Sequence, residues 1–213
     1  MAIATFLVYL FLPNRPMSSN IDTKREKIVL DKNLKILISI GVIIFTAFAL
    51  VQSITAYYVQ DRFDVSLDET AKTTALLLGT MAFMAIISQL TFVQKYKGNP
   101  LNLIKFSLPL FILSCLSIIL SPNFLFLYLG MALMGLGMGL ASPGYTSAAS
   151  LNADEDNQGA AVGLAMIAPG IGFALGPLIS GFLYSISMNL PFIFILPLFI
   201  ILAILIKKLE QLI

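Results

Sequence analysis

The stretch that decides the fold reads GAAVGLAMIAPGIGFALGPLISG and occupies residues 159–181. It carries no charged residue, and it is as long as the roughly 20 residues that an α-helix needs to cross the hydrocarbon core of a bilayer. A strand of a membrane β-barrel would be shorter and would alternate apolar with polar residues, which this stretch does not do. Because a continuous apolar segment can satisfy its backbone in lipid only as a helix, we predict a membrane-spanning helix here.

Similar apolar segments precede and follow this stretch along the chain. Apolar residues make up 58% of the 213 residues and charged residues only 11%, whereas a soluble domain carries roughly 25% charged residues. We therefore predict an all-α integral membrane fold, with one six-helix bundle over residues 34–208. The predicted helices are 34–58, 72–94, 102–120, 123–147, 159–185 and 189–207.

The first 33 residues carry a different pattern. Residues 1–13 are apolar but too short to cross a bilayer, and they lack the positive start of a signal peptide. We interpret them as the end of a preceding transmembrane helix, so that the chain would start in mid-protein. Residues 14–33, with Pro16 and mixed charges, are predicted to form a cytoplasmic linker.

The distribution of Lys and Arg predicts the orientation in the membrane. If the helices alternate in direction, all 13 Lys and Arg residues except Arg62 and Lys72 fall on one side. The positive-inside rule makes that side cytoplasmic, and the C-terminus with it. We expect the protein in a cell membrane, meaning an inner or plasma membrane, with residues 61–69 outside.

Small residues form two stripes on the predicted helix 159–185. At 100° per residue, Gly159, Gly163, Gly170, Pro177 and Gly181 share one side, and Ala165, Ala168, Gly172 and Gly176 lie opposite. Small residues allow helix backbones to approach closely in lipid, so we expect close packing on both sides. Two interpretations stay open: fixed tight packing, or a helix whose packing changes when the protein changes conformation.

The spacing of Gly163, Gly172, Gly176-Pro177 and Ser180-Gly181, together with two other segments, resembles the major facilitator superfamily of transporters. The strongest resemblance is to the superfamily's antiporter motif, although Ser180 stands where that motif has glycine. Residues 57–63, rich in tyrosine, are similar to the outer end of helix seven in drug exporters. The glycine-rich residues 130–145 match helix ten. The resemblance implies that the residues of this motif act in packing and in conformational change. They are Gly163, Gly172, Gly176, Pro177 and Gly181.

A further resemblance concerns the loop after residue 94. It looks like a degenerate copy of the superfamily's Gly-x-x-x-Asp-Arg-x-Gly loop, with Gln94 in place of the acidic residue. On this resemblance, Gln89, Gln94, Lys95 and Gly98 are candidates for a gate loop. Together the matches imply the C-terminal half of a drug:proton antiporter-like exporter. Its partners would be the lipid bilayer, a small-molecule substrate and an N-terminal six-helix half missing from this chain.

A cavity for substrate would be lined by the few polar, aromatic and methionine side chains of the spans. Met131, Met134 and Met138 are spaced by three and four residues and so share one helix face, where they could contact varied apolar ligands or simply pack. Gln52 could face the cavity or bond a neighbouring helix. The cavity candidates are Gln52, Tyr57, Met134, Met138 and Phe173.

Other functions find little support in the residues. The chain has no His and a single Cys115, which argues against a haem, a zinc site or any other cofactor or metal. The spans offer no paired acids or Ser–base pair for a membrane enzyme. Basic residues lie at the ends of apolar segments and form no patch for nucleic acid. One alternative remains open: a non-transporting remnant, or a half-subunit that pairs with another chain.

Overall fold

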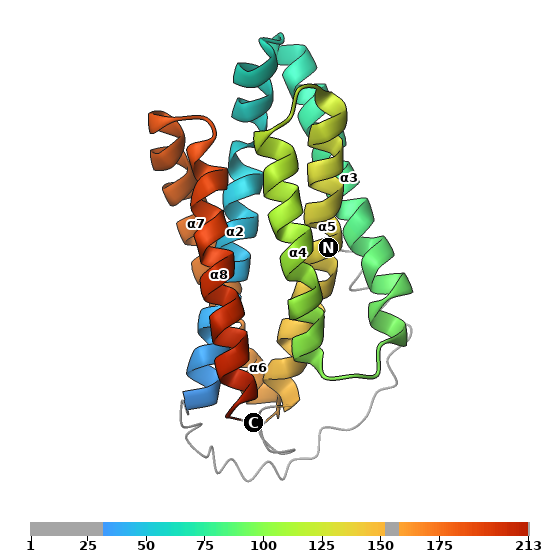
Figure 1. The fold of residues 1–213 in the computed structure, drawn as a ribbon, viewed down its shortest axis with the longest axis vertical. Coiled ribbons are helices and arrows are strands. Elements are labelled where there is room, and N and C mark those ends of the chain that lie inside the picture. Colours follow the sequence, from blue (N-terminus) through green and yellow to red (C-terminus); the bar gives the residue numbers. More distant parts are fainter. Residues whose placement is uncertain (1–31, 152–157, 213) are drawn as a thin grey trace, which may run out of the picture.

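The computed structural model describes residues 32–151 and 158–212 as a bundle of helices (Figure 1). Six spans are long and apolar enough to cross a membrane, so the predicted all-α fold with six transmembrane helices is confirmed. The helix end predicted at residues 1–13 and most of the linker at 14–33 lie outside the described residues. The elements are α2 (Lys32–Phe63), α3 (Leu67–Thr91), the 3-10 helix η1 (Val93–Lys95), α4 (Pro100–Ile119), α5 (Phe124–Leu151), α6 (Gln158–Ala165), α7 (Ile167–Ile186) and α8 (Leu190–Glu210).

The first helix extends beyond its predicted end at residue 58 and stops only at Phe63. Two long-range contacts hold this extra turn: the Tyr184 hydroxyl donates to Asp61 Oδ2 at 2.7 Å, and the Arg62 guanidinium donates to the Ser121 carbonyl at 3.0 Å. Asp64 then turns the chain with φ 50°, in the left-handed region. Charged residues therefore continue the helix past the apolar stretch.

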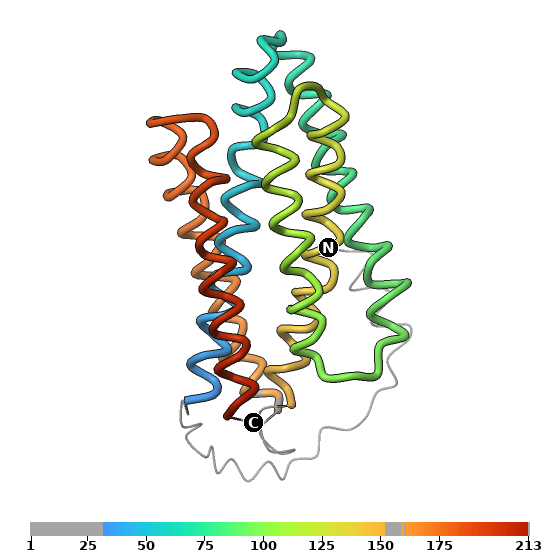
Figure 2. The backbone as a smooth tube through the Cα atoms, in the orientation of Figure 1, coloured from blue at the N-terminus to red at the C-terminus, as the bar shows by residue number. Residues whose placement is uncertain are grey.

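Helices α2 and α5 form the centre of the bundle. Helix α7 packs along α2, helices α3 and α4 pack along α5, and α8 contacts both α2 and α4. Figure 1 shows α3 and α7 at opposite edges, and Figure 2 follows the chain as it alternates between the two ends. Of the six spans, α2 is the most buried and those formed by α3 and by α6–α7 are the least. The two edge helices thus present most of their surface outward.

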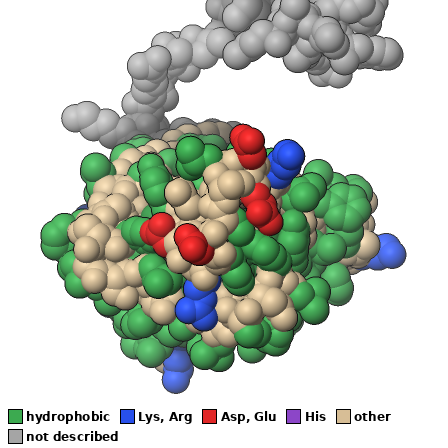
Figure 3. Space-filling view, turned by 90° about the horizontal axis from the view of Figure 1, so that it is seen from above, with side chains coloured by type: hydrophobic (Ala, Val, Ile, Leu, Met, Phe, Trp, Pro, Cys, Tyr) green, Lys and Arg blue, Asp and Glu red, His purple; other side chains and the backbone are tan. Residues whose placement is uncertain are grey.

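The two ends of the bundle carry opposite charge. Figure 3 looks onto the end with the α2–α3 turn, where Asp61, Asp64, Asp68 and Glu69 gather beside Arg62 and Lys72. The other end carries the lysines, as the alternation of the helices predicts. These lysines are Lys32, Lys35, Lys95, Lys97, Lys105, Lys207 and Lys208.

Candidate functional site

Helix α5 is packed on two sides through its glycines. A Cβ at Gly135 would overlap the carbonyl oxygen of Met81, and one at Gly139 would lie 2.5 Å from that of Ala85, both on α3. On another side, a Cβ at Gly137 would lie 2.6 Å from the Phe111 ring of α4. The Ser114 hydroxyl of α4 also donates to the Gly130 carbonyl at 2.7 Å. The two-sided packing predicted for the fifth span is therefore found in the fourth.

One stripe of α7 packs against α2 with a four-residue repeat. A Cβ at Gly172 would lie 2.6 Å from Phe45 Cβ, and one at Gly176 would lie 2.6 Å from Ala49 Cβ. One turn further, the Ser180 and Ser53 hydroxyls hydrogen-bond at 2.8 Å. The antiporter motif has glycine where this chain has Ser180. At this position a hydrogen bond between side chains therefore replaces a close contact at glycine. We call this set of contacts the α2–α7 interface.

The opposite stripe of α7 is open. At Gly163, Gly170 and Gly181 an added Cβ would meet no other helix of the described residues within 4 Å, and Pro177 is exposed. The expectation of close packing on both sides of this helix is therefore wrong within the described part of the chain. Gly172 and Gly176 belong to the α2–α7 interface, and Gly163, Pro177 and Gly181 lie outside it. The motif residues are thus divided between two faces.

The fifth span is broken between α6 and α7, and Tyr145 stabilises the break. Pro169 has no N–H to donate to the carbonyl of Ala165, four residues earlier. The Tyr145 hydroxyl of α5 donates to that carbonyl instead, at 2.7 Å. The Tyr145 ring fits beside α2 because residue 41 is glycine, where a Cβ would lie 2.5 Å from the ring. Sequence analysis overlooked Tyr145, although Pro169 indicates that a carbonyl needs a partner.

Two of the five cavity candidates, Phe173 and Gln52, lie on one side of the α2–α7 interface, each beside Phe48. The Phe173 side chain is 46% exposed, and its ring lies edge-on to that of Phe48, with centroids 6.2 Å apart. Gln52 is exposed one turn after Phe48 on the same face of α2. Phe48 lies near the middle of α2, which spans 32 residues. We call Phe48, Gln52 and Phe173 the Phe173 cluster: an open, uncharged surface with one amide at mid-span.

Tyr57 lies apart from the Phe173 cluster. Its ring is 61% exposed and contacts Tyr184 of α7, with centroids 6.3 Å apart. Tyr184 in turn donates its hydroxyl to Asp61. Tyr57 therefore belongs to the acidic end of the bundle, beside the α2–α3 turn.

The methionine stripe of α5 faces the core. Met134 is 1% exposed and Met131 2%, and Met138 is half-buried against the same cluster of side chains. The prediction that Met134 lines a cavity is therefore wrong in this conformation, because the side chain fills space between helices. Met spacing alone does not distinguish a core face from a cavity face, since both are apolar.

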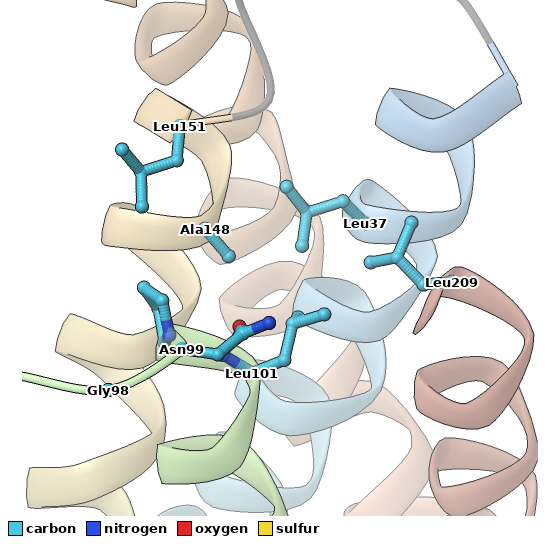
Figure 4. Close-up of a pocket in the computed structure, with 8 residues that line it drawn as sticks. Leu37, Gly98, Asn99, Leu101, Ala148, Leu151 and Leu209 are labelled. Atoms are coloured by element: carbon cyan, nitrogen blue, oxygen red, sulfur yellow. The ribbon is translucent and has the colours of Figure 1, made fainter. Parts of the chain in front are cut away.

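The gate-loop candidates lie at the lysine-bearing end. Gln89, Gln94 and Lys95 are exposed at the end of α3 and in η1. Gly98 borders a pocket of about 310 Å³, where apolar side chains of α2, α4, α5 and α8 converge (Figure 4). The Asn99 side chain beside it accepts the Leu101 N–H at 2.9 Å and so caps α4. Only Gly98 among the four candidates reaches this pocket.

The chemistry of the described spans is that of packing and apolar contact. Between Lys35 and Asp61 of α2, and from residue 159 to 206, the sequence has no charged residue. Among residues 32–151 and 158–212, no three His, Cys, Asp or Glu side chains come together as a metal site. The charge-free stretches of α2 and of α6–α8 can therefore contact an apolar or amphipathic molecule.

These features define a multi-pass α-helical membrane protein whose spans associate through glycine. Comparison with protein families matches the Major Facilitator Superfamily over residues 1–168 and again over 98–210. The chain belongs to the Major Facilitator Superfamily. It is accordingly a secondary transporter protein and not an enzyme, with the lipid bilayer and a small-molecule substrate as partners. A comparison with curated proteins found no match.

Proposed function

We propose that the chain is the C-terminal six-helix half of a transporter that exports apolar or amphipathic compounds. The observation that carries the proposal is the Phe173 cluster, an exposed aromatic surface at mid-span with one amide and no charge nearby. Sugars and anions would call for more polar or cationic groups than this surface offers. Aromatic rings with one hydrogen-bonding group suit a lipophilic cation, which can also interact with the ring faces.

The open stripe of α7 supports pairing with a second bundle. Lipid can cover large side chains such as Leu178 and Phe182, which are exposed on the same helix. Contact with lipid does not require glycine, whereas a close contact between two helices does require it. Gly163, Gly170 and Gly181 therefore suit the backbone of another helix. In this class of transporter two bundles rock around a site at the bilayer midplane, so the partner would be the N-terminal six-helix half.

Two further parts of the proposal follow from charge. The lysine-bearing end faces the cytoplasm, and with it the C-terminus, because positively charged residues are retained on that side. If transport is coupled to protons, the titrating carboxylate lies in the N-terminal half, since charges inside spans are rare and functional. Residues 159–206 and the centre of α2 hold no acidic residue.

Reconstitution in liposomes tests the proposal. We expect no movement of a fluorescent lipophilic cation under an imposed proton gradient with this chain alone, and gradient-dependent movement once a matching N-terminal half is added. Phe173→Ala should then slow the transport without loss of folded protein, whereas Leu178→Ala, on the exposed side of α7, should not. Movement of the dye by the chain alone would refute the assignment as a half and favour a self-sufficient dimer.

The alternative is a non-transporting remnant or a half-subunit for another chain. It predicts that the two halves associate, or fail to associate, without any gradient-dependent transport. Orientation is tested separately by single cysteines at Asp68 and Lys97 in a Cys115→Ser background, with an impermeant reagent on intact cells. Labelling at Lys97 but not at Asp68 would reverse the proposed orientation.

A further inference from the structure

A second apolar cavity lies at the surface of the bundle, between the end of α3 and the beginning of α4, where Phe92 and Phe106 are exposed. It has a volume of about 420 Å³, and α5 forms its floor. We call it the α3–α4 groove. Its lining includes Phe92, Tyr96, Phe106, Leu110 and Leu140.

The walls of this groove are almost entirely apolar and suit a hydrocarbon chain. The Tyr96 ring stands perpendicular to that of Phe106, with centroids 6.4 Å apart. Tyr96 can fold back in this way because residue 98 is glycine, where a Cβ would lie 2.5 Å from the Tyr96 hydroxyl. The one hydroxyl from α3 in the lining, that of Ser88, already donates to the Leu136 carbonyl at 3.1 Å. Little inside the groove remains to bind a polar ligand.

The mouth of the groove is positively charged. Lys95 and Lys97 flank Tyr96 in the sequence, and both are exposed. The sequence has no acidic residue from 70 to 153, so α3 beyond Glu69, η1, α4 and α5 offer these lysines no carboxylate. Lys105, one turn into α4, is by contrast paired with Glu210 of α8. Within residues 32–151 and 158–212, Lys95 and Lys97 thus stand beside an apolar groove without an ion pair.

We propose that the α3–α4 groove holds an acyl chain of an anionic phospholipid from the leaflet at the lysine-bearing end. The lipid phosphate would lie at Lys95 and Lys97, and the chain would lie between Tyr96, Phe106 and Leu110. The combination of an apolar groove on the lipid side with lysines at one end matches both parts of such a lipid. This inference requires only that the chain spans a membrane, and so it stands or falls independently of transport.

The chain has no tryptophan, which allows a direct test. Leu110→Trp places a single fluorophore in the groove, and Leu113→Trp places the control one turn away on α4, where the side chain is 51% exposed. Each variant of the full chain is reconstituted in phosphatidylcholine vesicles. One set of vesicles contains brominated phosphatidylglycerol, and the other contains brominated phosphatidylcholine at the same mole fraction. Phe106→Trp, also in the lining, serves if Leu110→Trp does not fold.

We expect brominated phosphatidylglycerol to quench the groove tryptophan with an affinity at least about fivefold above that of the neutral lipid, since a lysine near the membrane surface contributes about that factor. At Leu113→Trp the two lipids should quench equally. Lys95→Gln with Lys97→Gln should abolish the preference, whereas Lys208→Gln should leave it. Equal quenching at the groove position, quenching by neither lipid, or a preference that survives the loss of both lysines would overturn the proposal.

Discussion

Helices α5 and α7 are both rich in glycine, yet they use it differently. In α5, glycines on two sides are covered by α3 and α4. In α7, Gly172 and Gly176 are covered by α2, whereas Gly163, Gly170 and Gly181 face open space within the described residues. The comparison teaches that a glycine stripe marks a surface for a close helix contact without saying which chain or bundle provides it. The glycines of α5 are covered by helices of this bundle, whereas one glycine face of α7 is not covered within the described residues.

The largest effect is expected at the centre of α5. Gly135→Leu inserts a side chain where even a Cβ meets the carbonyl oxygen of Met81. Because α4 holds the other side, α5 cannot move away, and we expect a loss of about 3 kcal/mol or more in stability. The measurement is the thermal denaturation of the purified chain in detergent. The matched control is Gly79→Leu on α3, where an added Cβ meets nothing within 4 Å. Equal stability of the two variants would contradict two-sided packing of α5.

A smaller loss is expected at the α2–α7 interface. Gly176→Leu pushes α7 off Ala49 and Leu50, but the open stripe lets α7 shift outward, so we expect a cost of about 1–3 kcal/mol. Ile179→Leu, a change that conserves volume on the same helix, should cost less. Denaturation and expression level measure both. If Gly176→Leu left the denaturation and the expression level unchanged, the close α2–α7 contact would be wrong.

The serine pair in the same interface should contribute least among the packed contacts. Ser180→Ala removes the hydrogen bond to Ser53, and hydrogen bonds between membrane helices contribute about 0.6 kcal/mol on average. A double-mutant cycle with Ser53→Ala measures the coupling. Additive effects of the two substitutions would show that the 2.8 Å contact stabilises nothing.

No loss of stability is expected on the open stripe of α7. Gly170→Leu adds a side chain where an added Cβ would meet no other helix of the described residues within 4 Å, so the chain alone should denature as the parent does. Association with a matching N-terminal half should weaken, because the large side chain prevents a close helix contact. Co-purification of tagged halves measures this. Destabilisation of the chain alone would show that the stripe is already covered, which would remove the main difference between α5 and α7.

The six membrane-spanning helices could be predicted because each is marked by a local apolar segment that is long enough to cross a bilayer. The extra turn of α2 was not, since Asp61 and Arg62 are held by Tyr184 and Ser121, more than 50 residues away in sequence. Local propensity contains no information about such partners.

The candidate site was predictable only in part, for the same reason. Phe173 and Gln52 are exposed, but Met134 is buried because α5, unlike α7, is enclosed by its neighbours. Spacing places residues on a face of a helix, and the tertiary neighbours decide what that face contacts. Tyr145 could have been inferred from Pro169, since a proline in a membrane helix leaves a carbonyl that another helix must satisfy.

The hydrogen bond from Tyr145 to the Ala165 carbonyl also bears on the order of biosynthesis. The chain is made from its N-terminus, so α5 enters the bilayer before α6 and α7. An unsatisfied carbonyl in hydrocarbon costs several kcal/mol, and Pro169 creates one as soon as its segment is inserted. By then α5, which carries the Tyr145 hydroxyl, is already in the membrane, and so is α2, whose surface contacts Gly172 and Gly176. The broken span thus enters a membrane that already contains both of its contact partners, α2 and α5.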